Sequence, residues 1–324
     1  GMARKNRTPK NGTTSEQAYR LNLHGMNLLR KAGTENLARS IEALREAVRI
    51  DPNYAEAWAG LALAYFARST TLRPEGTEYD SSMDAVNHAL NIDPNSSAAY
   101  SALCANRYRF DYDSRGAGSA CRRALELDPN ASDAHHVYAL LLGSLARHDE
   151  AIAEIKAAID LEPASFFFHR SFANALYLGR RYDEAVERYK KNIELDPRHE
   201  PTYYWLTKAL EAQGNETEAF EYFIRLLKIQ NADETTTGRY QSIFRDAGYR
   251  GVLRERASNI NETNTFRVAC WYARLDEKDA AFDYLERSFA RKDWAITNLR
   301  VEPQLDPLLH DPRYTDLVRR LGGQ

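Results

Sequence analysis

The sequence predicts an all-α protein in which helix pairs stack into a superhelix, an α-solenoid. The first observation is a fixed period, because Ala151, Ala185 and Ala219 stand 34 residues apart, as do Pro163 and Pro197. The second is that each period contains two stretches with apolar residues at helical spacing. One such pair cannot bury its own apolar face, so we expect successive pairs to stack around a continuous core.

The chain begins with a segment unlike the repeats. Residues 1–14 place Arg4, Lys5, Arg7 and Lys10 among Gly, Asn, Thr and Pro. This composition predicts a disordered basic arm. The repeat array should then occupy residues 15–295.

The first three repeats vary in length. Asp51-Pro52 ends the first repeat, because proline has no N–H to donate and restrains the residue before it. Pro94 follows Pro52 by 42 residues, so about eight residues are inserted into repeat two, near Arg68–Glu78. We place these repeats near residues 21–54, 55–96 and 97–131.

The next three repeats form the regular part of the array, at residues 132–165, 166–199 and 200–233. Repeat seven (234–261) is degenerate, and Gly248 is expected to end its first helix. Repeat eight spans 262–295. A terminal repeat needs a cover for its apolar face, so we assign residues 296–324 as a C-terminal capping segment. The prediction is therefore about eight helix pairs plus a cap.

Small residues are expected where helices approach most closely. Large and small side chains must alternate for helix ridges to interdigitate. We therefore assign five alanines to the core and give them no chemistry: Ala139, Ala151, Ala158, Ala173 and Ala185.

Composition excludes several classes of function. A net charge of −2 argues against a general phosphate-binding surface, so we expect no direct nucleic-acid binding. Cys104, Cys121 and Cys270 are unclustered, which predicts reduced thiols and no zinc site. No apolar run is long enough to span a bilayer, and residues 1–20 lack a signal-peptide core. We expect a cytoplasmic protein.

No recognisable catalytic or cofactor motif is present, so we expect no enzyme activity and no cofactor. Asp111–Gly116 resembles the start of a calcium loop, but Arg115 and Arg122 replace two required oxygen ligands. We interpret it as a turn between helices. His135 and His136 are adjacent, and adjacent helical residues diverge too far to share a metal.

The 34-residue period and its small-residue pattern resemble the tetratricopeptide family over residues 21–295. A narrower resemblance lies in the stretch from Glu16–Tyr19 through Ser40–Glu42, in residues 51–62 and in the ending Val301–Tyr314. All three are similar to the tetratricopeptide region that follows a winged-helix domain, a class III nucleotide cyclase or a protein kinase in certain bacterial signalling proteins. The resemblance implies a tetratricopeptide-type superhelix that acts as an interaction or sensor module.

Two functions remain open. The first is a non-catalytic scaffold that binds a peptide or partner protein in the concave groove. The second is a regulatory or sensor domain of a bacterial signalling protein, which could respond to a small ligand. An effector domain upstream of Met2 would favour the second, and a natural start at Met2 would favour the first. No feature of the sequence indicates an oligomeric state.

The resemblance also implies which residues line the groove, because the first helix of each tetratricopeptide pair faces inward. Cations, an amide and phenols together suit an extended peptide with a carboxylate. Arg170 and Asn174 resemble the Lys/Asn pair of carboxylate-clamp members, although Trp205 stands where a second asparagine would be expected. The predicted partner-binding residues are Tyr108, Arg109, His136, Arg170, Asn174, Tyr177, Tyr204 and Lys208.

Overall fold

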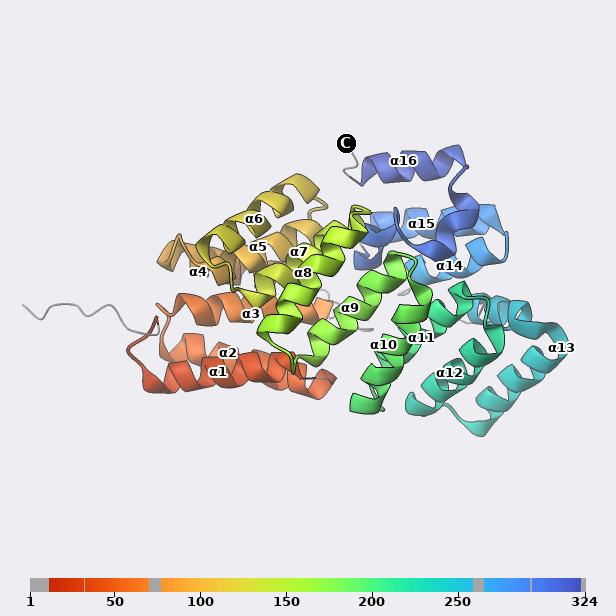
Figure 1. The fold of residues 1–324 in the computed structure, drawn as a ribbon, viewed down its shortest axis with the longest axis horizontal. Coiled ribbons are helices and arrows are strands. Elements are labelled where there is room, and N and C mark those ends of the chain that lie inside the picture. The colour runs from red at the N-terminus through yellow and green to blue at the C-terminus, as the bar shows by residue number, and fades with distance from the viewer. Residues whose placement is uncertain (1–11, 32, 70–76, 259–264, 292, 322–324) are drawn as a thin grey trace, which may run out of the picture. The chain divides into compact units, whose positions relative to one another are not determined.

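The computed structural model describes residues 12–31, 33–69, 77–258, 265–291 and 293–321, and within these ranges every regular element is a helix. The all-α prediction is confirmed. The helices, drawn in Figure 1, are α1 (Glu16–Arg30), α2 (Thr34–Ile50), α3 (Ala55–Ser69), α4 (Glu78–Ile92), α5 (Ser97–Arg109), α6 (Ser114–Leu127), α7 (Ser132–Ser144), α8 (His148–Leu161), α9 (Phe166–Leu178), α10 (Tyr182–Leu195), α11 (Glu200–Ala212), α12 (Glu216–Ile229), α13 (Glu234–Ser258), α14 (Thr265–Arg274), α15 (Lys278–Ala290), η2 (Trp294–Asn298), η3 (Pro303–Leu308) and α16 (Pro312–Arg320).

Two sequence-based expectations fall largely outside these ranges. Residues 1–11 of the expected basic arm and residues 70–76 of the expected insertion are not among the described residues. Of the arm's described part, Thr13 is buried and its hydroxyl donates to the Asp51 carboxylate.

The chain divides into two compact units. Unit 1 comprises Gly1–Asp111, Arg115–Tyr138 and Ala157–Phe167. Unit 2 comprises Tyr112–Ser114, Ala139–Lys156 and Phe168–Gln324.

In unit 1, glycines allow neighbouring helices to approach α2. A Cβ atom added at Gly25 of α1 would lie 2.6 Å from Leu44 Cγ, and one at Gly60 of α3 would lie 3.1 Å from Leu44 Cδ2. The Ser40 hydroxyl also donates to the Gly25 carbonyl at 2.8 Å. A larger side chain at Gly25 would therefore clash with Leu44 of α2, and one at Gly60 would press on Leu44 and on Met26 of α1.

A charged contact links distant parts of unit 1. The Arg30 guanidinium at the end of α1 lies 2.7 Å from the Asp133 carboxylate and 2.6 Å from the Glu162 carboxylate. The Arg30 side chain is only 16% exposed, so these charges are partly removed from water. The first helix of the array is thereby fixed to the ends of α7 and α8.

The expectation of reduced thiols is wrong for two of the three cysteines. Cys104 of α5 and Cys121 of α6 form a disulfide with a Cα–Cα distance of 5.3 Å, whereas Cys270 is free and buried. The physical reason is the turn between the two helices, which brings residues 17 apart in sequence face to face. Both cysteines sit at fully buried positions, and a Cα distance of this size suits a disulfide.

The close-packed alanines are buried as predicted. Ala151, Ala158, Ala173 and Ala185 are fully buried, and Ala139 is 4% exposed. A buried, well-packed site cannot absorb extra atoms without moving its neighbours.

Substitution of Ala173 by leucine should therefore lower the free energy of unfolding by about 1–3 kcal/mol. A matched Ala153→Leu change on the exposed side of α8 should shift it by no more than about 0.5 kcal/mol. Urea melts of the two variants and the wild type measure the difference. Equal midpoints for all three proteins would contradict the packing argument.

In unit 2, α13 is divided by a glycine. Gly248 adopts φ 63° and ψ −166° inside the element, between two helical stretches. A positive φ is favourable for glycine because it has no Cβ. The predicted break at Gly248 is confirmed.

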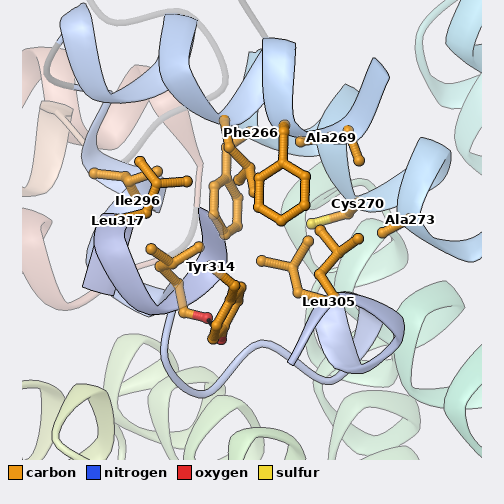
Figure 2. Close-up of a cluster of buried hydrophobic side chains, with 13 residues drawn as sticks. Phe266, Ala269, Cys270, Ala273, Ile296, Leu305, Tyr314 and Leu317 are labelled. Carbon is orange, nitrogen blue, oxygen red and sulfur yellow. Dashed lines mark hydrogen bonds between the residues drawn. The ribbon is translucent and has the colours of Figure 1, made fainter. Parts of the chain in front are cut away.

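The last elements of unit 2 pack on α14 and α15. Figure 2 shows Leu305, Tyr314 and Leu317 pointing into the same cluster as Phe266 and Cys270 of α14. The Tyr314 hydroxyl also donates to the Leu299 carbonyl at 2.5 Å. Residues after α15 thus supply much of the apolar contact that α14 and α15 make.

Candidate functional site

Three of the predicted partner-binding residues lie in unit 1 and are buried. Tyr108, Arg109 and His136 are 6%, 5% and 2% exposed. The Arg109 guanidinium lies 4.9 Å from the centroid of the Phe66 ring, and the His136 ring meets the Phe167 ring edge-on at 4.9 Å. These three side chains are therefore part of the packing of unit 1.

The other five predicted residues lie in unit 2, on α9 and α11. Tyr177 and Lys208 are buried, at 0% and 3% exposure. Arg170, Asn174 and Tyr204 are partly exposed. The predicted set is therefore divided into a buried pair and a partly exposed group.

The buried pair binds a carboxylate of the same chain. Glu302 lies just before η3, at the start of a segment that we call the C-terminal strap (residues 302–308). Its Oε1 accepts a hydrogen bond from the Tyr177 hydroxyl at 2.6 Å. Its Oε2 lies 2.6 Å from Lys208 Nζ, and both side chains of this ion pair are at most 4% exposed.

Aromatic rings surround the Lys208 ammonium. Its Nζ lies 4.5 Å from the ring centroid of Trp205, 5.2 Å from that of Tyr177 and 5.6 Å from that of Tyr204. Such faces attract a cation. Burial alone would lower the pKa of Lys208, but the Glu302 carboxylate outweighs it and holds that pKa above its usual value. Burial and the same carboxylate raise the pKa of the Tyr177 hydroxyl.

A second buried carboxylate lies one helical turn further along α11. Glu211 accepts hydrogen bonds from the Tyr249 hydroxyl and from the Gln304 amide of the C-terminal strap. Its Oε2 lies 2.7 Å from Arg274 Nη1, and its Oε1 lies 3.5 Å from Arg256 Nη1. Two cations therefore compensate this buried anion, as a charge of this kind requires.

The strap thus meets α11 at two matched positions. Lys208 and Glu211 are three residues apart and share one helical face, and they bind Glu302 and Gln304 respectively. A third contact lies at the exposed margin, where Arg180 makes two hydrogen bonds of 2.7 Å to Asp306. The strap, most of which is the 3₁₀ helix η3, therefore contacts α9, the turn after α9 and α11 through three polar side chains.

Sequence reasoning placed Tyr177 and Lys208 in a groove for a partner peptide, with the cation facing a carboxylate, but it missed the intramolecular partner Glu302 and the centre at Glu211. A signal was available, because Lys208 and Glu211 are the only charges in the stretch 201–212. Charges inside an apolar stripe are rarely buried unless paired. The stripe therefore indicated buried partners, although it could not identify them.

The partly exposed group includes a cation that the sequence analysis missed. The Arg267 guanidinium of α14 stacks over the Tyr204 ring, with 4.2 Å from Cζ to the centroid. Among the described residues, no carboxylate lies within ion-pair distance of it. Of the others, Asn174 accepts a hydrogen bond of 2.6 Å from Tyr189. Burial and the nearby Arg170 guanidinium lower the pKa of His199 to about 3.

Other kinds of site were searched for in the described ranges. There, no three His, Cys, Asp or Glu side chains are grouped so that they could hold a metal ion. The helices described are each too short or too polar to cross a bilayer.

Two segments match family models for the tetratricopeptide repeat. Residues 34–68 match a model described as TPR repeat, and residues 132–165 match one described as tetratricopeptide repeat. The second segment is the predicted fourth repeat. Such repeats typically serve as non-catalytic scaffolds.

Solved structures resemble the chain in fold. A monomeric mutant of IFIT1 with Gppp-AAAA is 14% identical, with a TM-score of 0.52 over 84% of this chain and 71% of that chain. TTC0263, a thermophilic TPR protein in Thermus thermophilus, is 19% identical, with a TM-score of 0.45 over 60% of this chain and 98% of that one. YrrB, a TPR protein with an unusual peptide-binding site, is 18% identical, with a TM-score of 0.40 over 62% and 99%.

No curated protein matches the chain. The narrower resemblance to bacterial regulators, cyclases and kinases stays a prediction. The fold and the matched segments agree, however, on one conclusion. The chain is an all-helical solenoid that contains tetratricopeptide repeats.

Proposed function

We propose that this protein is a non-catalytic interaction scaffold that binds an acidic segment of a partner protein on unit 2. The contact surface comprises Tyr204 and Arg267, and it extends to Arg170 and Asn174 in the preceding repeat. We call these four residues the open surface. Tetratricopeptide repeats bind protein or peptide partners, which supports the general class of function.

The observation that carries the proposal is the Arg267–Tyr204 pair. A guanidinium that lies over a phenol ring can still donate hydrogen bonds to another group. Because no described carboxylate neutralises Arg267, a partner's carboxylate can bind it with charge-assisted hydrogen bonds. The Tyr204 ring adds apolar contact area, as tyrosine does at many interfaces.

Neighbouring chemistry favours an acidic ligand at this place. The Tyr204 ring also faces Lys208, whose ammonium already holds the Glu302 carboxylate. Arg267 and Lys208 thus both lie against Tyr204, and the chain itself supplies a carboxylate to Lys208. Arg267 presents similar chemistry to a partner.

A charge-reversal experiment tests the open surface. The Arg170→Ala/Arg267→Glu variant should lose partner affinity by about 10- to 100-fold, because a hydrogen bond to a charged group contributes about 1.5–3 kcal/mol. Immobilised wild type first identifies partners from the source cells. Calorimetry with the purified partner then measures the affinity of each variant.

The matched control is Arg198→Glu, a charge reversal at an exposed position of unit 2 between α10 and α11. This variant should retain the wild-type affinity. Circular dichroism melts establish that both variants fold. A folded Arg170→Ala/Arg267→Glu protein that binds every partner as tightly as wild type would rule out the open surface.

A further inference from the structure

Three polar side chains of the C-terminal strap each contact different polar groups of unit 2. Glu302 binds Lys208 and Tyr177, Gln304 binds Glu211, and Asp306 binds Arg180. The spacing is two residues at each step. The unit 2 groups that the strap contacts, which we call the receptor groups, thus bind an acid, an amide and a second acid.

Elements other than the strap also hold the groups that bind it. Tyr177 lies at the end of α9, Arg180 lies in the turn after it, and Lys208 and Glu211 belong to α11, which packs on α10 and α12. Glu211 keeps Tyr249, Arg256 and Arg274 as partners apart from Gln304. The row of receptor groups is therefore held in place by several elements of unit 2.

Apolar contacts accompany the polar ones. Leu305 and Leu308 of the strap are fully buried in the cluster with Phe266 and Cys270. Pro303 separates Glu302 from Gln304, Leu305 separates Gln304 from Asp306, and all of these except Glu302 belong to the 3₁₀ helix η3. Fixed polar spacing together with apolar anchors is how peptide-binding surfaces achieve specificity.

We propose that the row formed by Tyr177, Arg180, Lys208 and Glu211 is a peptide-recognition site for which the C-terminal strap is the resident ligand. Its external ligand is a partner segment that contains a glutamate. Glutamine follows two residues after that glutamate, and leucine and aspartate follow three and four residues after it. This inference rests on the proposed function and deepens it, because Tyr204 lies against the same Lys208 ammonium that binds Glu302.

The resident strap sets the affinity that an external segment must reach. A short tether holds a ligand at an effective concentration of the order of millimolar. An equivalent free peptide therefore competes only at about millimolar concentration with the wild-type chain. Any change that weakens the strap without altering the receptor groups should increase the apparent affinity for the free peptide.

A labelled peptide tests this competition. The probe is a 13-residue peptide with the sequence of residues 299–311, titrated into full-length protein and followed by fluorescence anisotropy. Glu302→Gln protein should bind it at least about tenfold more tightly than wild type, because the strap has lost its ion pair. A probe peptide in which glutamine replaces the glutamate should bind the Glu302→Gln protein no more tightly than the wild type.

Asp306→Asn serves as a second strap variant, because the Arg180–Asp306 pair is exposed and its loss should leave the fold intact. It should raise peptide affinity several-fold. Adding Lys208→Met to Glu302→Gln removes the receptor cation and should abolish the gain. If the folded Asp306→Asn and Glu302→Gln proteins bind the probe no better than wild type, the strap is only structural and the inference is wrong.

The two proposals fail separately. Loss of peptide binding alone, with partner affinity still dependent on Arg267, would overturn only the peptide-recognition site. Partner affinity that does not change when Arg267 is substituted, together with the expected tighter peptide binding by the strap variants, would overturn only the open surface.

Discussion

Lys208→Ala should lower the free energy of unfolding by about 3–5 kcal/mol, because it leaves the Glu302 carboxylate buried without its cation. Both side chains of the pair are at most 4% exposed, so bulk solvent compensates the remaining carboxylate poorly. Urea denaturation followed by circular dichroism measures the loss as a lower midpoint.

Two companion variants separate the ion pair from other effects. Arg181→Ala removes an exposed pair with Glu184, whose side chains are 41% and 52% exposed, and should cost less than about 1 kcal/mol. The double change Lys208→Met/Glu302→Leu removes both charges and should recover most of the stability that Lys208→Ala loses. A Lys208→Ala protein as stable as Arg181→Ala would show that the pair is not buried.

Cutting the chain after Asn298 should have the largest effect on solution behaviour. The cut removes Leu305, Leu308, Tyr314 and Leu317 from the cluster on α14 and α15, and full burial of one such side chain contributes about 1.5–3 kcal/mol. It also leaves Lys208 and Glu211 without their strap partners. The truncated protein should aggregate or bind a hydrophobic dye.

Size-exclusion chromatography with light scattering measures this outcome. A chain cut after Leu321 is the matched control and should behave as the full-length protein does. A monodisperse protein ending at Asn298, with an unchanged melting temperature, would contradict the capping role that we propose for residues 296–324.

The fold was predictable because its signals are local and repeated. The 34-residue period, the helical spacing of apolar residues and the proline boundaries each depend on residues close in sequence. The break at Gly248 belongs to the same class of signal, since one glycine with a positive φ divides α13.

The contacts of the site were only partly predictable, because they join positions far apart in sequence. Tyr177 and Lys208 could be placed on the first helices by counting within the repeat. Their ligand, Glu302, lies 94 residues after Lys208, in a segment outside the period. No local pattern connects the two.

The disulfide was missed for a related reason. Cys104 and Cys121 belong to the two helices of one pair, and each takes a buried position of the repeat, with Ile155 standing 34 residues after Cys121. Counting cysteines in the whole chain therefore pointed to free thiols. Only the packing of α5 on α6 reveals that the two sulfur atoms meet.

The most direct test of partner binding on unit 2 is site-specific photo-crosslinking in the source cells. A benzophenone amino acid replaces Tyr204 on α11 in one protein and Tyr222 on α12 in another, since both tyrosines are partly exposed. Our account predicts a crosslinked partner at Tyr204 that disappears when Arg267→Glu is added, and no such partner at Tyr222. Equal crosslinking at both positions, or crosslinking at Tyr222 alone, would contradict it.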